Sequence, residues 1–428
     1  MTTPENTIPL GLSNSPGGYR EALKSRDFLK LFIGQLGSEI GNGAMQLALP
    51  FLVLDITGSA FQLGFAYFWQ FLPMLLFGIL GGVFVDRWDR RLTIVVVDAI
   101  RAVAFLSAAV VFYLGHLTVE HIYALIFLES SLANFFNPAR AALMPNLVSP
   151  ENLRPANSLM EVSRHIGFLP APIAGGAIAA AFGPASLLVI DGVTFALSGI
   201  MVFLITWRPP ARHNHDETQP SEGFRKATEL VITQTKEGLK VIKERKLLQV
   251  SVLLGFSLNL IIAPIQVLLP LFIREVKDAA DGYLALLVGG LLVGLIIGSL
   301  SAPATARRIG LGILTIVSII LLGFVVSVAA WPAGFQVPLA AMTIAGIAIG
   351  GLNVAQTTML QSSTNDEDRG RVSATYYTFS LGVRPFGYLA VGALASAVDI
   401  RIMFTVLGIA AIFLGLYLLR VREVREHA

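Results

Sequence analysis

Twelve stretches of the chain are apolar over about 20 residues or more, and this pattern restricts the fold more than any other feature. A helix needs roughly 20 apolar residues to cross about 30 Å of hydrocarbon. The stretches are too long for membrane strands and lack their alternation. We therefore predict spanning helices at 28–53, 60–85, 92–114, 121–144, 154–181, 184–206, 247–273, 283–303, 311–331, 337–361, 371–397 and 400–419.

Composition agrees with a membrane protein. Of the 428 residues, 54% are hydrophobic and 14% are charged, whereas a soluble protein carries about 25% charged residues. Cysteine is absent, which excludes disulfides, thiolate metal sites and cysteine nucleophiles. The polar first 20 residues lack the apolar core of a cleavable signal peptide, so we expect a short cytosolic tail.

Lysine and arginine indicate the orientation. If both termini are inside, the inner segments hold 24 of the 31 basic residues, the outer loops hold three and the spans hold four. Positive residues accumulate on the cytoplasmic side of membrane proteins. We expect a multi-pass protein in the plasma (inner) membrane of a prokaryote, with both termini cytoplasmic.

A polar segment divides the chain into three parts: 1–206, the linker 207–246, and 247–428. The second part of this linker, 224–246, places apolar residues near one helical face and charged residues on the other. This pattern is typical of an amphipathic helix on the inner leaflet; we favour a solvated linker helix whose charges set the orientation, with a lipid-sensing helix as the alternative.

A charged loop joins the second and third runs and contains Gly82, Asp86, Arg87, Arg90 and Arg91. Its glycine and last arginine recur at an offset of 216 residues, as Gly298 and Arg307. Many secondary transporters are built from two such related halves. We predict an all-α membrane protein with twelve transmembrane helices in two pseudo-symmetric six-helix bundles.

The loop resembles the signature of the major facilitator superfamily, with Asp89 where a glycine is usual. Within that superfamily the chain is similar to the macrolide-efflux and enterobactin-exporter branch of drug:proton antiporters. The likeness covers nearly the whole chain and is most specific over 31–206. Matching stretches include 34–38, 137–140, 144–148 and 190–195. The resemblance implies alternating access, and export more often than import.

Span five also resembles the antiporter motif of drug exporters, through Gly167, Pro172, Gly175 and Gly176. The resemblance implies that this span packs closely on span eight and seals the cavity against leak. Small residues also permit generic tight helix packing, which explains the same residues.

Acids inside a membrane span cost on the order of 3 kcal/mol each, which makes them functional candidates. Glu39 lies about 17 Å along its helix from Phe28 and has no basic residue within a turn. We expect it to carry a coupling proton or to line a wet cavity. We expect Glu129 to bind a proton or a cationic substrate, and Asp191 to accept a proton or a structural hydrogen bond.

Two acid–base pairs are three residues apart and share a helix face: Asp98 with Arg101, and Glu161 with Arg164. We predict that both join Arg140 and the charged loop (Asp86, Arg87, Arg90 and Arg91) in one buried network. That network would hold the two bundles together in one state and release them in the other.

Polar and aromatic residues within the spans are candidates for a substrate cavity, although packing or lipid contact explains many of them equally. In the first half these are Trp69, Gln70, Phe135 and Phe136. In the second half they are Asn259, Gln266, Asn353, Gln356, Tyr376, Tyr377, Arg384 and Tyr388. An apolar, lightly polar cavity suits bulky amphipathic ligands.

The leading hypothesis is a proton-coupled exporter of a hydrophobic or amphipathic compound, such as a drug, a macrolide or a siderophore. The alternative is a lysophospholipid or lipid flippase, or a metabolite permease of the same fold. An enzyme is not favoured because metal-protease and phosphate-loop motifs are absent, and the repeat argues against a channel. We expect no cofactor or metal, no nucleic-acid partner, a monomer in the lipid bilayer, and a proton gradient as energy source.

Overall fold

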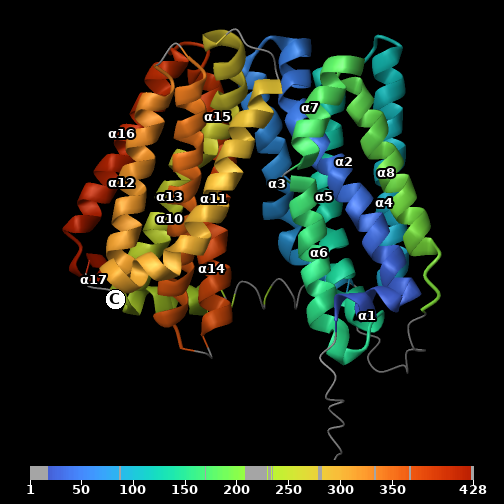
Figure 1. Cartoon of the computed structure of the whole chain (residues 1–428), viewed down its shortest axis with the longest axis horizontal. Helices are drawn as coiled ribbons and strands as arrows, with labels where there is room; N and C mark the ends of the chain where they lie inside the picture. Colours follow the sequence, from blue (N-terminus) through green and yellow to red (C-terminus); the bar gives the residue numbers. More distant parts are fainter. Residues whose placement is uncertain are drawn as a thin grey trace, which may run out of the picture.

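The computed structural model describes residues 18–85, 88–168, 170–207, 229, 233, 235–277, 282–331, 334–365 and 368–425. Within these ranges the chain forms helices and turns, without strands. The spanning helices form two bundles side by side, which Figure 1 shows in blue to green and in yellow to red. We call them the front bundle (α2–α8) and the rear bundle (α10–α16).

The front bundle follows a short surface helix, α1 (Tyr19–Lys24). It consists of α2 (Arg26–Thr57), α3 (Ala60–Val85), α4 (Arg90–Tyr113), α5 (Val119–Leu143), α6 (Leu153–Phe168), α7 (Pro170–Phe182) and α8 (Ala185–Phe203). Two 3₁₀ turns (Met144–Asn146 and Pro150–Asn152) join α5 to α6. The Asp89 side chain accepts a hydrogen bond from the Leu92 backbone N–H (3.0 Å) and caps α4, because a carboxylate satisfies a free donor at a helix start.

The rear bundle consists of α10 (Lys246–Leu271), the π-helical turn η3 (Phe272–Val276), α11 (Gly282–Ile309), α12 (Leu311–Ala329), α13 (Gln336–Ser362), α14 (Arg369–Gly382), α15 (Arg384–Leu394) and α16 (Ile400–Leu419). The short α17 (Arg422–Arg425) follows. Gly310 joins α11 to α12 with a φ of 84°, a conformation that glycine adopts without a steric penalty.

Nine helices in the described ranges are long and apolar enough to cross a membrane: α2, α3, α4, α8, α10, α11, α12, α13 and α16. The predicted fourth span is α5, whose apolar pattern is interrupted by Glu129 and Arg140. The predicted eleventh span is divided in two, as α14–α15, while the predicted fifth span is described as α6 and α7 on either side of residue 169, which lies outside the described residues. Pro385 lies in the first turn of α15, where a missing N–H leaves no helical bond unmade.

The two bundles contact one another mainly through α15 and α7. Helix α15 packs on α3 of the front bundle, and α7 contacts α11 of the rear bundle. Arg274 in η3 also forms an ion pair with Asp55 of α2 (2.6 Å). These contacts lie at the end of the molecule away from α1 and α17, which we call the far end; near α1, the helices of the two bundles are separate (Figure 1).

Glycines allow the closest of these contacts. A side-chain carbon added to Gly64 of α3 would lie 2.5 Å from the Tyr388 carbonyl oxygen and 3.0 Å from the Gly392 Cα atom of α15. Real Cβ atoms do not approach other atoms so closely. At the far end the backbones of α3 and α15 are therefore in direct contact, as in other contacts between membrane helices that small residues permit.

The described end of the linker packs on the rear bundle. Residues 235–244 are helical, and Ile242 is buried in a cluster with Leu248, Val372 and Tyr376. Glu237 forms an ion pair with Arg371 of α14 (3.0 Å). The apolar face at Ile242 thus packs on the rear bundle, because that surface already offers apolar partners; most of 208–234 lies outside the described residues.

Candidate functional site

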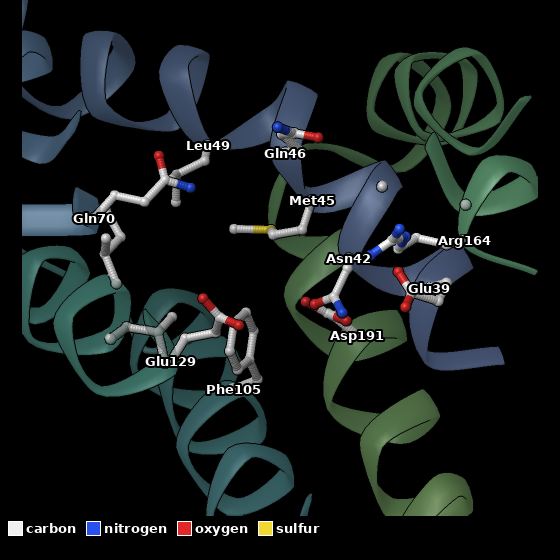
Figure 2. Close-up of a pocket in the computed structure, with 14 residues that line it drawn as sticks. Glu39, Asn42, Met45, Gln46, Leu49, Gln70, Phe105, Glu129, Arg164 and Asp191 are labelled. Carbon is white, nitrogen blue, oxygen red and sulfur yellow. The ribbon is translucent and has the colours of Figure 1, made fainter. Parts of the chain in front are cut away.

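Two neighbouring cavities lie inside the molecule. The first, of about 200 Å³, lies within the front bundle and is lined by Glu39, Asn42, Gln70, Glu129, Arg164 and Asp191, among others. We call it the carboxylate cavity (Figure 2). The second, of about 240 Å³, lies between the bundles, and we call it the inter-bundle cavity. Gln46 and Gln70 line both, so the two spaces adjoin.

The inter-bundle cavity is almost entirely apolar. Fourteen of its nineteen lining residues come from the rear bundle, and most of these are leucine, isoleucine or valine. Its side-chain polar groups are the amides of Gln46, Gln70 and Gln266 and the hydroxyl of Tyr67. A few polar groups in an apolar wall bind a bulky ligand and fix its orientation.

Three acids from three helices point toward the carboxylate cavity: Glu39 of α2, Glu129 of α5 and Asp191 of α8 (Figure 2). Helix α2 brings Glu39 to this point because Gly167 of α6 packs directly on it. A carbon on Gly167 would lie 2.7 Å from the Glu39 Cβ atom. The structure therefore brings together all three residues that we predicted as proton-coupling candidates.

Glu39 is paired with a base that its own helix does not provide. Arg140 of α5 lies 3.2 Å from the Glu39 carboxylate and donates a second hydrogen bond to the Gln35 side-chain oxygen (3.1 Å). Glu129 is paired in the same way with Arg101 of α4, at 3.3 Å. Sequence spacing finds neither partner, since each lies on another helix.

Asp98 is fully buried beside Arg101 and takes part in this charge cluster. Its Oδ1 atom lies 4.0 Å from the Arg101 guanidinium, and its Oδ2 atom accepts a hydrogen bond from the Ser198 hydroxyl (2.7 Å). Arg101 is 4% exposed and lies against the rings of Phe136 and Phe195, at 4.9 and 5.1 Å from their centroids. Burial makes the pairing of these charges obligatory, because an unpaired charge there is costly.

Asp191 is the least neutralised acid of the carboxylate cavity. Only 1% of its surface is exposed, and its Oδ1 atom has no hydrogen-bond partner in the part of the chain that the structure describes. The neighbouring position is occupied by Gly41, where any side chain would clash with the Asp191 carboxylate (2.5 Å). A carboxyl group in such a place can bind and release a proton as its surroundings change.

The prediction of one buried network that includes both acid–base pairs, Arg140 and the charged loop is wrong, because several of these residues lie outside the buried cluster. Glu161 and Arg164 pair at 2.5 Å, but their side chains are 56% and 54% exposed rather than buried. Arg90 donates to the Ala142 carbonyl (3.0 Å), and Arg91 donates to the carbonyls of Val202 and Phe203. These loop arginines hold helix ends within the front bundle, since backbone carbonyls there lack helical partners. Asp86 and Arg87 lie outside the described residues.

Several predicted cavity residues lie elsewhere. Trp69 packs edge-on against Phe65, Phe68 and Phe127 within the front bundle and lines neither cavity. Phe135 stacks on Trp88, and Phe136 lies between the guanidinium groups of Arg101 and Arg140. Asn353 and Tyr377 are exposed, and Tyr376 donates to Gln356 (3.1 Å) near the linker. Gln70 and Gln266 alone of the predicted set line the inter-bundle cavity.

Arg384 and Tyr388 lie where the bundles meet. Arg384, the first residue of α15, donates to the Asn259 side-chain oxygen (2.6 Å) and lies over the Phe71 ring of α3 (5.8 Å). Tyr388 is fully buried, donates to Gln266 (2.7 Å), and contacts the rings of Tyr67 and Phe71. Sequence reasoning missed Tyr67, Phe71 and Gln46, although their polar or aromatic nature within spans was a usable signal.

The predicted contact of span five with span eight is present between α7 and α11, but the two motif glycines whose surroundings are described do not face α11. Gly167 faces Glu39, and a carbon on Gly175 would lie 2.7 Å from the Ala44 Cα atom, so both face α2. Gly176 lies in α7, as does Pro172, whose side chain is outside the described part. The tight packing of these two glycines on α2 thus fixes the position of Glu39.

Comparison with known proteins identifies the family. The family model described as Major Facilitator Superfamily matches residues 31–381. The chain belongs to the Major Facilitator Superfamily. The resemblance of its charged loop to the superfamily signature is confirmed, and the chain is a multi-pass membrane transporter rather than an enzyme.

Curated relatives within the superfamily match the predicted branch. The chain is 25% identical to macrolide efflux protein A of Streptococcus pyogenes over 411 residues, which cover 93% of this chain and 96% of that protein. It is 23% identical to the multidrug efflux pump Tap of Mycobacterium tuberculosis over 415 residues, which cover 95% and 96%.

Solved structures share the superfamily fold at low sequence identity. The nucleoside transporter NupG superposes with a TM-score of 0.70 at 13% identity, over 94% of this chain and 100% of that one. A bacterial homologue of the iron transporter ferroportin superposes with a TM-score of 0.67 at 17% identity, over 92% and 98%. The predicted all-α fold of two six-helix bundles is confirmed.

Proposed function

We propose that this transporter exports a hydrophobic or amphipathic small molecule in exchange for protons. The observation that carries the proposal is the junction of the two cavities at Gln46 and Gln70. An apolar space of about 240 Å³ there adjoins three carboxyl groups that can accept protons or a cationic group. The names of the macrolide and multidrug efflux relatives support the direction of transport.

Within this proposal, the chain lies in the inner membrane of a prokaryote with both termini and α1 in the cytoplasm, as its basic residues favour. The far end then faces outward. Because the bundles touch at the far end and are separate near α1, the structure corresponds to an inward-open state. Transport requires the far-end contacts to open and the α1 end to close.

The charge of the carboxylate cavity narrows the substrate class. Arg140 and Arg101 pair with Glu39 and Glu129, which leaves Asp191 as the acid of the cavity without a hydrogen-bonded base among the described residues. This disfavours anionic iron chelators and favours neutral or cationic amphiphiles such as macrolides. A lipid flippase is the second candidate, because the wall of the inter-bundle cavity would also accept an acyl chain.

The test uses everted vesicles that contain the wild-type protein, with a radiolabelled macrolide and a lipophilic cationic dye as probes. We expect both to accumulate when the vesicle interior is acid and to leave when a protonophore collapses the gradient. Accumulation that does not depend on the gradient would contradict proton coupling. Movement of a fluorescent lysolipid, with neither probe transported, would favour the flippase instead.

The Gly64→Ala variant tests the far-end contact. We expect the added carbon to destabilise closure by about 1–3 kcal/mol, which corresponds to about a 5–150-fold shift between two states. The chain lacks cysteine, so Val288→Cys in the inter-bundle cavity reports accessibility alone. Labelling by an impermeant maleimide in intact cells should rise in Gly64→Ala and stay unchanged in Gly37→Ala, whose added carbon meets nothing within 4 Å.

A further inference from the structure

The two glutamates of the carboxylate cavity are joined through the protein interior. Starting at Glu39, Arg140 bridges to the Gln35 side-chain oxygen (3.1 Å), and the Gln35 amide donates to the Ser198 hydroxyl oxygen (3.3 Å). Ser198 donates to Asp98 (2.7 Å), which faces Arg101 at 4.0 Å. Arg101 then reaches Glu129 (3.3 Å). This path, which we call the buried chain, crosses α2, α5, α8 and α4 and returns to the same cavity.

The middle of the buried chain is closed to solvent. Gln35, Ser198 and Asp98 are at most 1% exposed. Water therefore does not screen the interactions between these groups, and an effect on one of them reaches the next with little loss. Glu39 and Glu129, at the two ends, are about one quarter exposed or less and line the cavity (Figure 2).

Donors and acceptors give the buried chain a fixed direction. A serine hydroxyl has one proton, and Ser198 uses it for Asp98. Ser198 therefore accepts from Gln35, which turns the Gln35 oxygen toward Arg140. A change of charge at Asp98, or a shift of the Arg101 guanidinium relative to it, alters the strength of the hydrogen bond from Ser198, and the orientation of Gln35 transmits this change to the partner of Glu39.

At each end, one arginine is shared between a glutamate and the interior. Arg101 divides its guanidinium between Glu129 and Asp98, and Arg140 divides one nitrogen between Glu39 and Gln35. When a glutamate takes up a proton, its arginine loses an anion and turns toward the interior group. Protonation of one glutamate thus changes the proton affinity of the other without direct contact of the two carboxylates.

We propose that Gln35, Ser198 and Asp98 couple Glu39 to Glu129, so that the two cavity carboxylates bind and release protons as one unit. Gln35 and Ser198 are positioning residues in this scheme, since they act through the arginines and do not line the cavity. The inference rests on the proposed proton coupling, and it gives that coupling a path. In the part of the chain that the structure describes, the remaining charged groups around the two glutamates are Asp191 of α8 and Arg164 and Glu161 of α6.

The experiment measures protonation without a substrate, so it is independent of the transport test. Wild-type protein in lipid nanodiscs is titrated by infrared spectroscopy of the carboxyl band, and the signal lost in Glu39→Gln assigns Glu39. In an otherwise wild-type chain, we expect Glu129→Gln to change the proton affinity of Glu39 about tenfold, the level at which two sites titrate as a pair.

Cutting the buried chain should remove most of that change. In a Ser198→Ala background, we expect Glu129→Gln to shift the midpoint of Glu39 protonation, in pH units, by less than half as much as it does in the wild-type background. The matched control is Ser163→Ala, a buried serine of the same bundle whose hydroxyl bonds to the Met160 carbonyl of its own helix; it should leave the coupling intact. Gln35→Met provides a second cut if Ser198→Ala does not fold.

An equal shift in the wild-type and Ser198→Ala backgrounds would overturn the proposal, because simple repulsion across the cavity would then explain the coupling. Independent titration of the two glutamates in the wild-type chain would overturn it as well. If the two glutamates titrate as a pair but transport does not depend on the proton gradient, this inference holds and the proposed function is wrong.

Discussion

Glu39→Gln is expected to abolish accumulation of the macrolide and dye probes that is driven by the proton gradient. The variant keeps the shape of the side chain and its contact with Arg140 but removes the carboxyl group that we propose binds the coupling proton. Glu39 also lies where Gly167 of α6 packs against α2, so it is placed to sense movement between these helices. Downhill movement of the probes should continue, because the apolar wall of the inter-bundle cavity is untouched.

The control for this variant is Glu120→Gln. Glu120 is an exposed acid in the first turn of α5, the helix that also carries Glu129 and Arg140. We expect wild-type accumulation from this control in the same vesicles. Accumulation at the wild-type rate and with the wild-type gradient dependence in Glu39→Gln would remove Glu39 from the coupling mechanism.

Arg101→Met is expected to cause the largest loss of stability. It leaves Asp98 and Glu129 without their shared cation in a region where Asp98 is fully buried. Removing one partner of a buried ion pair costs about 3–5 kcal/mol, whereas exposed pairs contribute about 0–1 kcal/mol. The same substitution at Arg164, which is half-exposed, should therefore have little effect.

Thermal unfolding of the purified protein, followed by the fluorescence of its four tryptophans, measures the difference. The Tm should fall clearly in Arg101→Met and hardly in Arg164→Met. Adding Asp98→Asn to Arg101→Met should recover part of the loss, because one unpaired negative charge is then removed. Equal Tm values for the two arginine variants would contradict the structural importance of the buried pair.

Apolar run length was enough to predict the architecture, because each span must satisfy its backbone hydrogen bonds internally and so must be a helix. The same reasoning did not predict the division of the eleventh span, since proline is tolerated within membrane helices when neighbouring groups compensate. Here Pro385 lies in the first turn of α15, directly after the division.

The candidate site was predicted less completely. The three acids were found because a charge inside an apolar run is conspicuous, yet their arginine partners were not. Arg140 lies 101 residues from Glu39, and only the packing of α5 on α2 joins them. Trp69, in contrast, was predicted to line the substrate cavity but does not line it. An aromatic ring within a span carries no sign of the face it occupies, and this ring packs between α3 and α5.

In the proposed mechanism, proton coupling and ligand choice reside in different halves of this molecule. The acids of the carboxylate cavity all belong to the front bundle, while most of the apolar wall of the inter-bundle cavity belongs to the rear one. Mutations that reshape the rear wall can therefore alter which compounds bind without changing the carboxyl groups proposed to couple transport to the gradient. Selection in the presence of a new toxic compound then has a route to a new specificity that leaves proton coupling intact.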